Sequence, residues 1–447
     1  MSNDAGHQTP LNRARRKAYL RLLPLLFLCY VIAYVDRVNV SIAKLTMTKD
    51  LPGFDNAVIG FGAGLFFWGY FLLEIPGSLL VEKWSARRLL CRIMVTWGLA
   101  AALTAIVRTP AHFYGLRFLL GLAEAGFFPG IIVYLTHWFP ARDRARALSW
   151  FLIATPVAQI VSPKISNALL KIGSDEMVNG SLVRHAELLG MKGWQWVYIF
   201  WGAPAVVLGF VVLFFLTDRP RHARWLTPEE SGALENEIEQ EKARSAAGKR
   251  MTVLEAFRNP KVLLLAAAYF CSTTANYAVE FFLPSILQRW YQLKLDTLTW
   301  LVILPPTLAL AGQLFVGWNS DRTRERRLHA VVPMALGLLA LAATPLTRGH
   351  LPLTIGCFMI VAAGIKAYQP AFWSLPSLFL TQSAAAASIG LINSVGNLGG
   401  FFGPTILGHV ERLTGSFDGG IYYLCCSMAV CVTIIFLLGL GRRESKK

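Results

Sequence analysis

Ionisable side chains interrupt stretches of sequence that are otherwise apolar enough to cross a bilayer. The segment CYVIAYVDRVNVSIAKL, residues 29–45, carries an acid and a base side by side at Asp36 and Arg37. A charge at the centre of a membrane helix costs about 2.5–3.5 kcal/mol on insertion scales, so such groups must face each other or water rather than lipid. Eight of them lie well inside predicted spans: Asp36, Arg37, Glu74, Arg117, Glu124, Lys164, Glu280 and Lys366.

The chemistry of these residue types suits a site that binds an anion and exchanges protons. A guanidinium recognises a carboxylate in a two-point fork, and the attraction is stronger in a poorly hydrated cavity than in water. A carboxyl beside an arginine changes its proton affinity when that arginine is engaged elsewhere. Arg117 and Glu124 are seven residues apart, so they share a helix face, whereas the adjacent Asp36 and Arg37 point about 100° apart and pair poorly.

Membrane helices must position these side chains. Of 447 residues, 55% are hydrophobic and only 15% are charged, and the mean hydropathy is +0.48, which excludes an ordinary soluble domain of this size. Windows of about 20 apolar residues, the length that crosses hydrocarbon, predict twelve spans at 20–46, 57–80, 88–107, 112–138, 146–170, 194–217, 261–290, 297–319, 329–347, 352–379, 385–409 and 420–440.

Charge distribution predicts the orientation of the chain. The termini and the even-numbered loops hold most of the 43 Lys and Arg residues, so we expect both termini in the cytoplasm of a bacterium and the spans in its inner membrane. This topology explains the net charge of +17 through contact with anionic lipid, and we expect no nucleic acid partner. The seven cysteines fall inside spans and suggest neither disulfides nor a metal site.

A polar interval divides the spans six and six. We predict an N-terminal six-helix bundle over 1–217, a cytoplasmic connector with a short surface helix over 218–260, and a C-terminal six-helix bundle over 261–447. Central charges fall on the first, fourth, seventh and tenth spans. In a fold built from three-helix repeats, such equivalent helices converge on one cavity.

A short loop motif recurs at the same place in each half. SLLVEKWSARR follows the second span and GWNSDRTRERR follows the eighth, each with an acid, a base, three residues and two arginines. Positive-inside charge alone explains the arginines but not the repeated acid. We therefore predict that the motif gates the cytoplasmic side by forming ion pairs in one conformation only, through Glu82, Arg87, Arg88, Asp321, Arg322, Arg326 and Arg327.

Several longer motifs resemble a known family. YVDRVN, FFWGYFLLEIPGSLL, RFLLGLAEAGFFPGIIVYLTHWFP, GWQWVYIF, LTDRPRHARWLTPEE, FWSLPSLFL and INSVGNLGGFFGP are similar to those of the anion:cation symporter family of the major facilitator superfamily. The chain most resembles the branch that includes the tartrate, phthalate and hydroxyphenylacetate permeases. The likeness extends from about residue 18 to about residue 440 and names no substrate.

The resemblance implies roles for matching positions. It implies that Arg37 contacts a substrate carboxylate, that Asp36 and Glu124 belong to the proton-coupling machinery, and that Arg117 is the basic residue of the family's RxxxG element. Other polar or aromatic positions expected near the pocket are matched by Tyr34, Tyr70, Gln159, Trp373, Ser374 and Asn393.

Some positions depart from the family pattern. Ser85 replaces a glycine and Glu82 an aspartate in the first gate motif, and Trp201 stands where relatives often have an acid. Glu280 and Lys366 are charges that the pattern does not lead us to expect. Lys366 either binds a second carboxylate of the ligand or pairs internally with Glu280, and the sequence leaves both open.

Together these observations predict an all-α membrane protein with twelve transmembrane helices in two pseudo-symmetric six-helix bundles, the major facilitator fold. We expect a monomeric, proton-coupled symporter that imports a small organic carboxylate such as a hydroxy acid, sugar acid or aromatic acid, without cofactor or metal. An organic anion exchanger or exporter is the alternative, followed by a non-transporting membrane sensor. An enzyme is not expected, because the eight histidines form no nucleophile–base set or metal-spaced cluster.

Overall fold

The computed structural model describes residues 9–83, 85–178, 181–246, 255, 258–378 and 382–441. The helices of the first half are α1 (Pro10–Val38), α2 (Val40–Asp50), α3 (Asn56–Lys83), α4 (Ala86–Leu103), α5 (Pro110–Glu124), α6 (Phe127–Thr136), α7 (Ala141–Leu152), α8 (Ala154–Leu170) and α9 (Gly193–Phe215). The connector contains α10 (Pro228–Ala246). The second half contains α12 (Pro260–Tyr291), α13 (Leu295–Leu301), α14 (Leu304–Thr323), α15 (Arg327–Ala343), α16 (Leu351–Ala367), α17 (Gln369–Ser374), α18 (Gln382–Asn397), α19 (Gly399–Thr414) and α20 (Asp418–Leu438).

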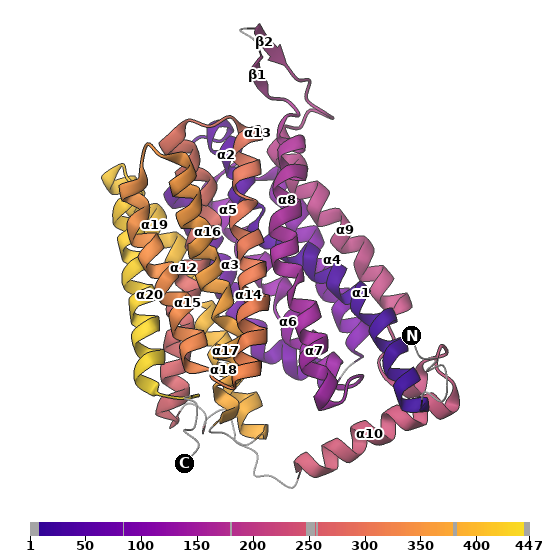
Figure 1. The fold of residues 1–447 in the computed structure, drawn as a ribbon. Helices are drawn as coiled ribbons and strands as arrows, with labels where there is room; N and C mark the ends of the chain where they lie inside the picture. The colour runs from indigo at the N-terminus through magenta and orange to yellow at the C-terminus, as the bar shows by residue number, and fades with distance from the viewer. Residues whose placement is uncertain are drawn as a thin grey trace, which may run out of the picture.

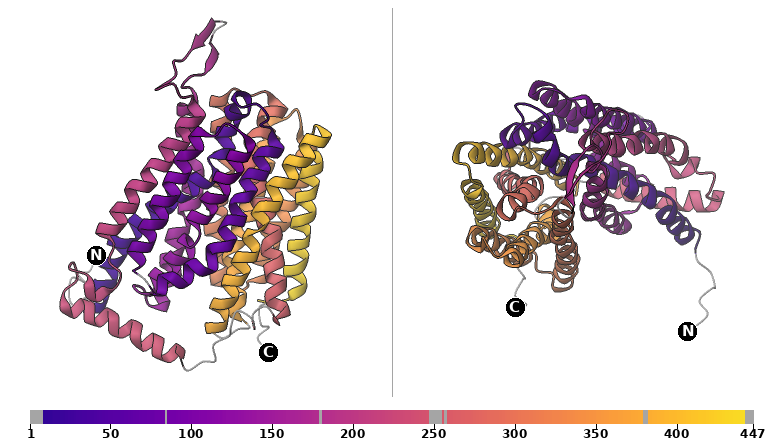
Figure 2. Two further views of the ribbon diagram at one scale, coloured as in Figure 1. Left: turned by 180° about the vertical axis from the view of Figure 1, so that it is seen from behind. Right: turned by 90° about the horizontal axis from the view of Figure 1, so that it is seen from above.

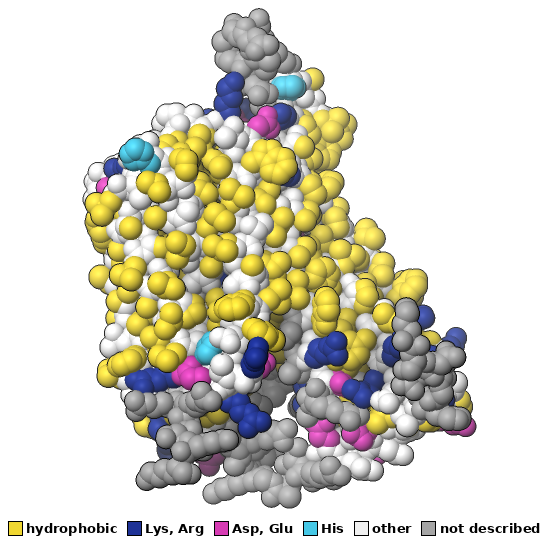
Figure 3. All heavy atoms as spheres, in the orientation of Figure 1, with side chains coloured by type: hydrophobic (Ala, Val, Ile, Leu, Met, Phe, Trp, Pro, Cys, Tyr) yellow, Lys and Arg dark blue, Asp and Glu magenta, His cyan; other side chains and the backbone are white. Residues whose placement is uncertain are grey.

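The helices form a membrane bundle, as predicted. Within the described part of the chain, eleven helical segments are long and apolar enough to cross a bilayer. The remaining predicted span, 385–409, is divided between α18 and α19, which meet at Leu398 and have 16 residues each. Apolar side chains cover the flanks of the bundle, and Lys and Arg side chains gather at its ends (Figure 3). This distribution matches a hydrocarbon belt between two aqueous faces.

The two halves of the chain lie side by side around a central axis. Viewed from above, the helices of the first half group on one side and those of the second half on the other (Figure 2). The start of α1, the end of α20 and the helix α10 lie at one end of the bundle, called here the terminal end (Figure 1). The opposite end, the hairpin end, carries an antiparallel pair of strands that the sequence did not predict, β1 (Asp175–Val178) and β2 (Ser181–Arg184).

Helix breaks occur beside the central charges. The first predicted span is interrupted at Asn39, between α1 and α2, and the fourth is interrupted between Glu124 and Phe127. Gly126 adopts φ +87° at the second break, a backbone conformation that favours glycine. The tenth span is interrupted at Tyr368, two residues after Lys366. Interrupted helices of this kind are tolerated at membrane depth where they line a cavity or are buried in protein.

Small residues let the two halves approach closely along α3 and α19. A Cβ atom on Gly60 would lie 2.4 Å from the carbonyl oxygen of Pro404, and one on Gly400 would lie 2.5 Å from the ring of Phe67. At the hairpin end, Lys171 also pairs with Asp296 at 3.0 Å across the halves. At the terminal end the helices of the first half lean away from α14 and α17 (Figure 1). The halves are therefore joined at the hairpin end and diverge at the terminal end.

The first helix begins earlier than predicted and holds the connector. The sequence placed the span at 20–46, whereas α1 starts at Pro10, where the Thr9 side chain accepts a hydrogen bond from the backbone of Asn12 at 3.3 Å. This added segment of α1 reaches α10, because Lys17 Nζ lies 2.7 Å from Glu230 Oε2. The connector helix is thus attached to the first half.

Candidate functional site

Asp36 and Arg37 lie at the end of α1, beside the break at Asn39, and face different partners. Asp36 is 1% exposed and Arg37 is 7% exposed. The indole Nε1 of Trp97 on α4 donates to Asp36 Oδ2 at 2.6 Å. Arg37 forms an ion pair with Glu124 of its own half, and its second guanidinium nitrogen donates to the Tyr277 hydroxyl of the other half at 3.1 Å. The two neighbours therefore serve separate parts of the site, as their helical spacing predicts.

Arg117 adds a second guanidinium to the same region. It is 1% exposed, and its three guanidinium nitrogens have no hydrogen-bond acceptor among the described residues. Its Cζ lies 5.4 Å from the centre of the Phe66 ring, and Arg37 Cζ lies 5.1 Å from the same ring. Phe66 therefore lies against both cations. A buried guanidinium without an acceptor is costly, so this region has unsatisfied capacity to bind an anion.

Glu280 on α12 is the centre of a second polar cluster, which joins the halves. Its carboxylate accepts hydrogen bonds from the Tyr34 hydroxyl and from Gln159 Nε2, each at 2.8 Å. Lys366 Nζ of α16 lies 3.1 Å from the same carboxylate. Of the two arrangements that the sequence left open for Lys366, the structure contains the pair with Glu280.

A cavity adjoins this second cluster. Its lining includes Gln159 and Ser162 from the first half and Asn276, Glu280 and Lys366 from the second half, together with apolar side chains of α1, α12 and α14. Pockets with mostly apolar walls and a few convergent polar groups are the usual sites for small molecules. The cavity is therefore a candidate site for a small ligand between the two halves.

The remaining residues that the resemblance assigned to a pocket are distributed around this centre. The Tyr70 ring lies 5.2 Å from Arg37 Cζ, and Asn393 of α18 donates to Glu74 of the other half. Trp373 packs edge-on against Tyr269 with ring centres 4.8 Å apart. Tyr70 and Asn393 thus contact charged groups between the halves, whereas the observed packing partner of Trp373 is another aromatic side chain.

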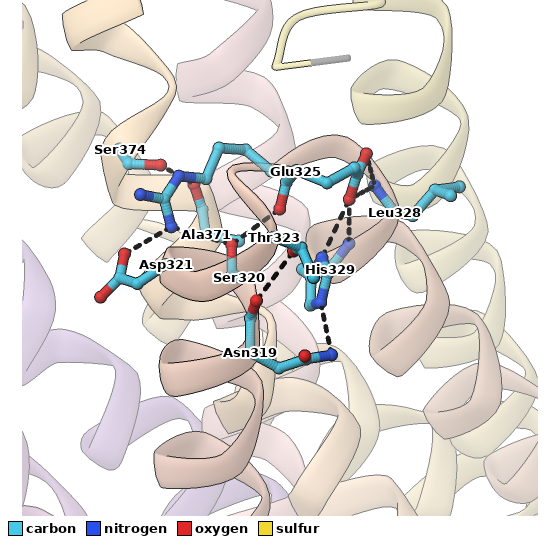
Figure 4. A network of polar contacts seen from close by, with 10 residues as sticks. Asn319, Ser320, Asp321, Thr323, Glu325, Leu328, His329, Ala371 and Ser374 are labelled. Atoms are coloured by element: carbon cyan, nitrogen blue, oxygen red, sulfur yellow. Dashed lines mark hydrogen bonds and ion pairs between the residues drawn. The ribbon is translucent and has the colours of Figure 1, made fainter. Parts of the chain in front are cut away.

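Ser374 lies towards the terminal end, near the second gate motif (Figure 4). Its hydroxyl donates to the carbonyl oxygen of Ala371 at 2.7 Å. In the same view, Asp321 pairs with Arg326 at 2.6 Å, and Arg326 also donates to Ser320 Oγ at 2.9 Å. The structure therefore brings Ser374 to the gate motif and not to the cluster around Glu280.

The other gate residues make different contacts in the two halves. In the first half, Ser85 and the backbone N–H of Arg87 donate to Asp218, at 2.7 and 2.9 Å, and Arg88 is exposed. The side chain of Glu82 lies outside the described part of the structure. In the second half, Arg322 and Arg327 stack on the Trp318 and Phe436 rings, with Cζ atoms 5.4 and 4.2 Å from the ring centres.

Sequence reasoning missed several of these partners. Asp218 lies more than 130 positions beyond Ser85, although it belongs to the quoted motif LTDRP. Tyr277 precedes Glu280 by one helical turn on α12, a spacing that could have indicated a shared face. Trp97 carries no charge, so the search for buried ionisable groups passed over it.

The arrangement of two joined helical halves around a polar centre agrees with comparison to known proteins. The pattern of the Major Facilitator Superfamily matches residues 26–404. The chain belongs to this superfamily. The protein is therefore a multi-pass membrane transporter and not an enzyme, as the sequence predicted.

Individual relatives within the superfamily are similar to this chain over nearly its whole length. It is 41% identical over 428 residues to a protein of Agrobacterium vitis named "Putative tartrate transporter", covering 95% of this chain and 94% of the relative. It is 35% identical to the "Quinolone resistance transporter" of Acinetobacter baumannii, covering 96% of each. The fold matches that of the xylose transporter XylE from E. coli in a partially occluded inward open conformation, with TM-score 0.69, 13% identity and coverage of 96% and 100%. The first of these relatives agrees with the anion:cation symporter branch that the motifs resemble.

Proposed function

We propose that this facilitator imports a small organic carboxylate together with protons. It would act as a monomer in a bacterial inner membrane, with both termini in the cytoplasm. The position of Arg37 carries the proposal. Its guanidinium reaches Glu124 in one half and Tyr277 in the other, so a carboxylate that binds Arg37 engages the interface that must move. The name of the Agrobacterium vitis relative supports a hydroxy diacid as the first substrate to test.

Coupling to protons follows from competition for Arg37. A substrate carboxylate that takes the guanidinium removes the partner of Glu124, and a buried carboxylate without its cation binds a proton more readily. Binding of the anion and binding of the proton then favour each other, as thermodynamic linkage requires.

The charges around the centre support the same coupling. Three cations and four carboxyl groups lie there, so an added anion without a proton would increase the negative charge in a region of low dielectric. These groups are Arg37, Arg117, Lys366, Asp36, Glu74, Glu124 and Glu280.

Transport would proceed by rocking residues 1–217 against residues 261–447. The contacts at the hairpin end would hold that side closed, and the terminal end, where the helices of the two halves diverge (Figure 1), would face the cytoplasm. Substrate would be held by Arg37, Tyr34, Tyr70, Arg117, Gln159, Lys366, Trp373 and Asn393, with Asp36 and Glu124 carrying protons.

Uptake into proteoliposomes tests this proposal. With the purified protein reconstituted, an acidic exterior should drive accumulation of labelled tartrate, and a protonophore should abolish the accumulation. Sugar acids and aromatic acids at equal concentration would rank the substrate class. Tartrate movement that ignores the pH gradient but requires a counter-anion inside would contradict symport and favour the exchanger.

An exporter is the second candidate, because one relative is named for quinolone resistance. Cells that express this chain should then retain less of a fluorescent quinolone than cells that express the Arg37→Gln variant. Equal retention, together with proton-driven tartrate uptake, would leave import as the function.

A further inference from the structure

A second cavity lies between the halves at the hairpin end, away from the central site. It has a volume of about 360 Å³, within the range of about 300–1,000 Å³ that is usual for small-molecule sites. Its walls come from α2 and the start of α3 in the first half and from the end of α12 in the second half. A ligand held there would contact both halves on the side that is closed in this conformation.

The lining of this cavity is basic. Lys44, Lys49 and Arg289 contribute to it, with Thr48, Asn56 and Gln288 as further hydrogen-bonding groups, and the described lining contains no acidic side chain. Arg289 is already neutralised, because it forms an ion pair with Glu411 and donates to the carbonyl oxygen of Gly415 at 2.6 Å. The two lysines are therefore the basic groups of this lining for which the described part of the structure contains no ion pair.

Lys44 is the residue that indicates a ligand. Its side chain is 2% exposed, and Nζ has no hydrogen-bond acceptor among the residues that the structure describes. The ammonium lies 3.7 Å from the centre of the Phe282 ring. A ring attracts a cation but accepts none of its three N–H donors in the geometry of a normal hydrogen bond, and this attraction is much smaller than the cost of removing water from an ammonium. The burial of Lys44 is explained if its donors are aimed at an anion.

We propose that this cavity, called here the hairpin-end site, binds one small oxyanion, either a carboxylate or a phosphate. Lys44 would bind the anion on the buried side of the cavity, and the exposed Lys49 would bind it on the solvent side. Gln288 would contact it from the second half. Because the anion would join α2 to α12, its binding would stabilise the conformation in which the hairpin end is closed. The site is separate from Arg37 and its function does not require that the same anion be transported.

Thermal unfolding of the full-length protein in detergent tests the proposal. Sodium phosphate and sodium tartrate are titrated separately at constant ionic strength set with sodium chloride, and the midpoint of unfolding is followed by tryptophan fluorescence. At least one of the two anions should raise the midpoint saturably. The effective one identifies the source of the oxyanion, and the Arg37→Gln variant should keep the effect, because it alters only the central site.

Variants of the lysines then assign the effect to the site. Lys44→Met keeps the length of the side chain and removes the charge, so the anion concentration needed for half the effect should rise by about tenfold or more. Lys44→Arg should retain most of the response. If Lys44→Met does not fold, Lys49→Gln, at an exposed position, should raise the half-effect concentration by about threefold.

The proposal is overturned if neither oxyanion stabilises the wild-type protein beyond chloride. It is equally overturned if the response is lost in Arg37→Gln but unchanged in Lys44→Met, or in Lys49→Gln where the former does not fold. In that case the anion acts only at the central site.

Discussion

The two halves of the molecule hold their central charges in different ways. In the second half, Glu280 and Lys366 pair with each other, and Glu280 is also satisfied by Tyr34 and Gln159. In the first half, Arg37 shares its guanidinium with Glu124 while Arg117 has no acceptor among the described residues. The second half therefore pairs its two central charges with each other, whereas the first half contains an arginine whose guanidinium has no acceptor among the described residues. On the proposed function, an anion would bind first to the half that contains α1 and α5, and the pair in the other half would open or close in response.

Removal of Arg37 should have the largest effect. Arg37→Gln removes the two-point fork and leaves Glu124 without its cation. Breaking a buried pair costs about 3–5 kcal/mol, so uptake of tartrate below saturation should fall by about 100-fold or more. Arg37→Lys keeps the charge without the fork and should lie between wild type and Arg37→Gln. Near-normal uptake by Arg37→Gln would show that Arg37 of the first half does not bind the substrate.

Glu124 should separate proton coupling from binding. Glu124→Gln keeps the size and hydrogen bonding of the side chain but cannot exchange a proton. We expect proton-driven accumulation to fall by about tenfold or more, while exchange of internal for external tartrate stays within about twofold of wild type. The two rates are measured in the same proteoliposomes. Equal loss of both rates would show that Glu124 only holds Arg37 in position and does not carry the proton.

The pair in the second half should show strong coupling between its members. Lys366→Gln and Glu280→Gln each leave a buried charge unpaired, and each should reduce uptake by about tenfold. The double variant should lose less than the product of the two single effects, because both charges are then gone. Strictly multiplicative losses would contradict the self-neutralised pair.

The same variants decide whether Lys366 also meets the ligand. If Lys366 binds a second carboxylate, Lys366→Gln should impair uptake of diacids more than uptake of monoacids. Equal loss for the two classes of substrate would restrict Lys366 to its pair with Glu280.

The attachment of the connector to the first half should have the smallest effect. Burial would raise the pKa of the Glu230 carboxyl, but hydrogen bonds and charge from Lys17, with further help from the Thr227 backbone and Arg13, hold that pKa below its ordinary value. A lowered pKa stabilises the fold above the unfolded value of about 4.3 and loses this contribution as pH falls through the folded value. Because Lys17 is half exposed, the contribution should be about 1 kcal/mol or less.

Glu230→Gln should therefore lower the unfolding midpoint by about 1–2 °C at pH 7 and by less near pH 4. Lys17→Gln is the matched control and should reproduce the loss. A larger loss at the lower pH would show that the carboxyl is not held by its cations.

The architecture could be predicted from the sequence because it depends on local properties. Span lengths, the interval at 218–260 and the charges on the first, fourth, seventh and tenth spans are each visible within short windows, and the twofold repeat needs only a comparison of two loops. Span boundaries were less accurate. The start of α1 was placed ten residues late because the basic segment before it looks like a polar tail, and its partner Glu230 is more than 200 residues away.

The sequence by itself determined which side chains are costly in a membrane and must therefore find partners or water. Only the tertiary structure decided which residues those partners are. They are Trp97 for Asp36, Tyr277 and Glu124 for Arg37, and Asp218 for the first gate loop. Lys44 shows the same limit, because a lysine near a span end is expected to extend to water and only packing of α2 against α12 buries it. The physical reason is that the cost of burying a charge belongs to the residue, whereas the hydrogen bonds that offset it belong to segments brought together by the fold.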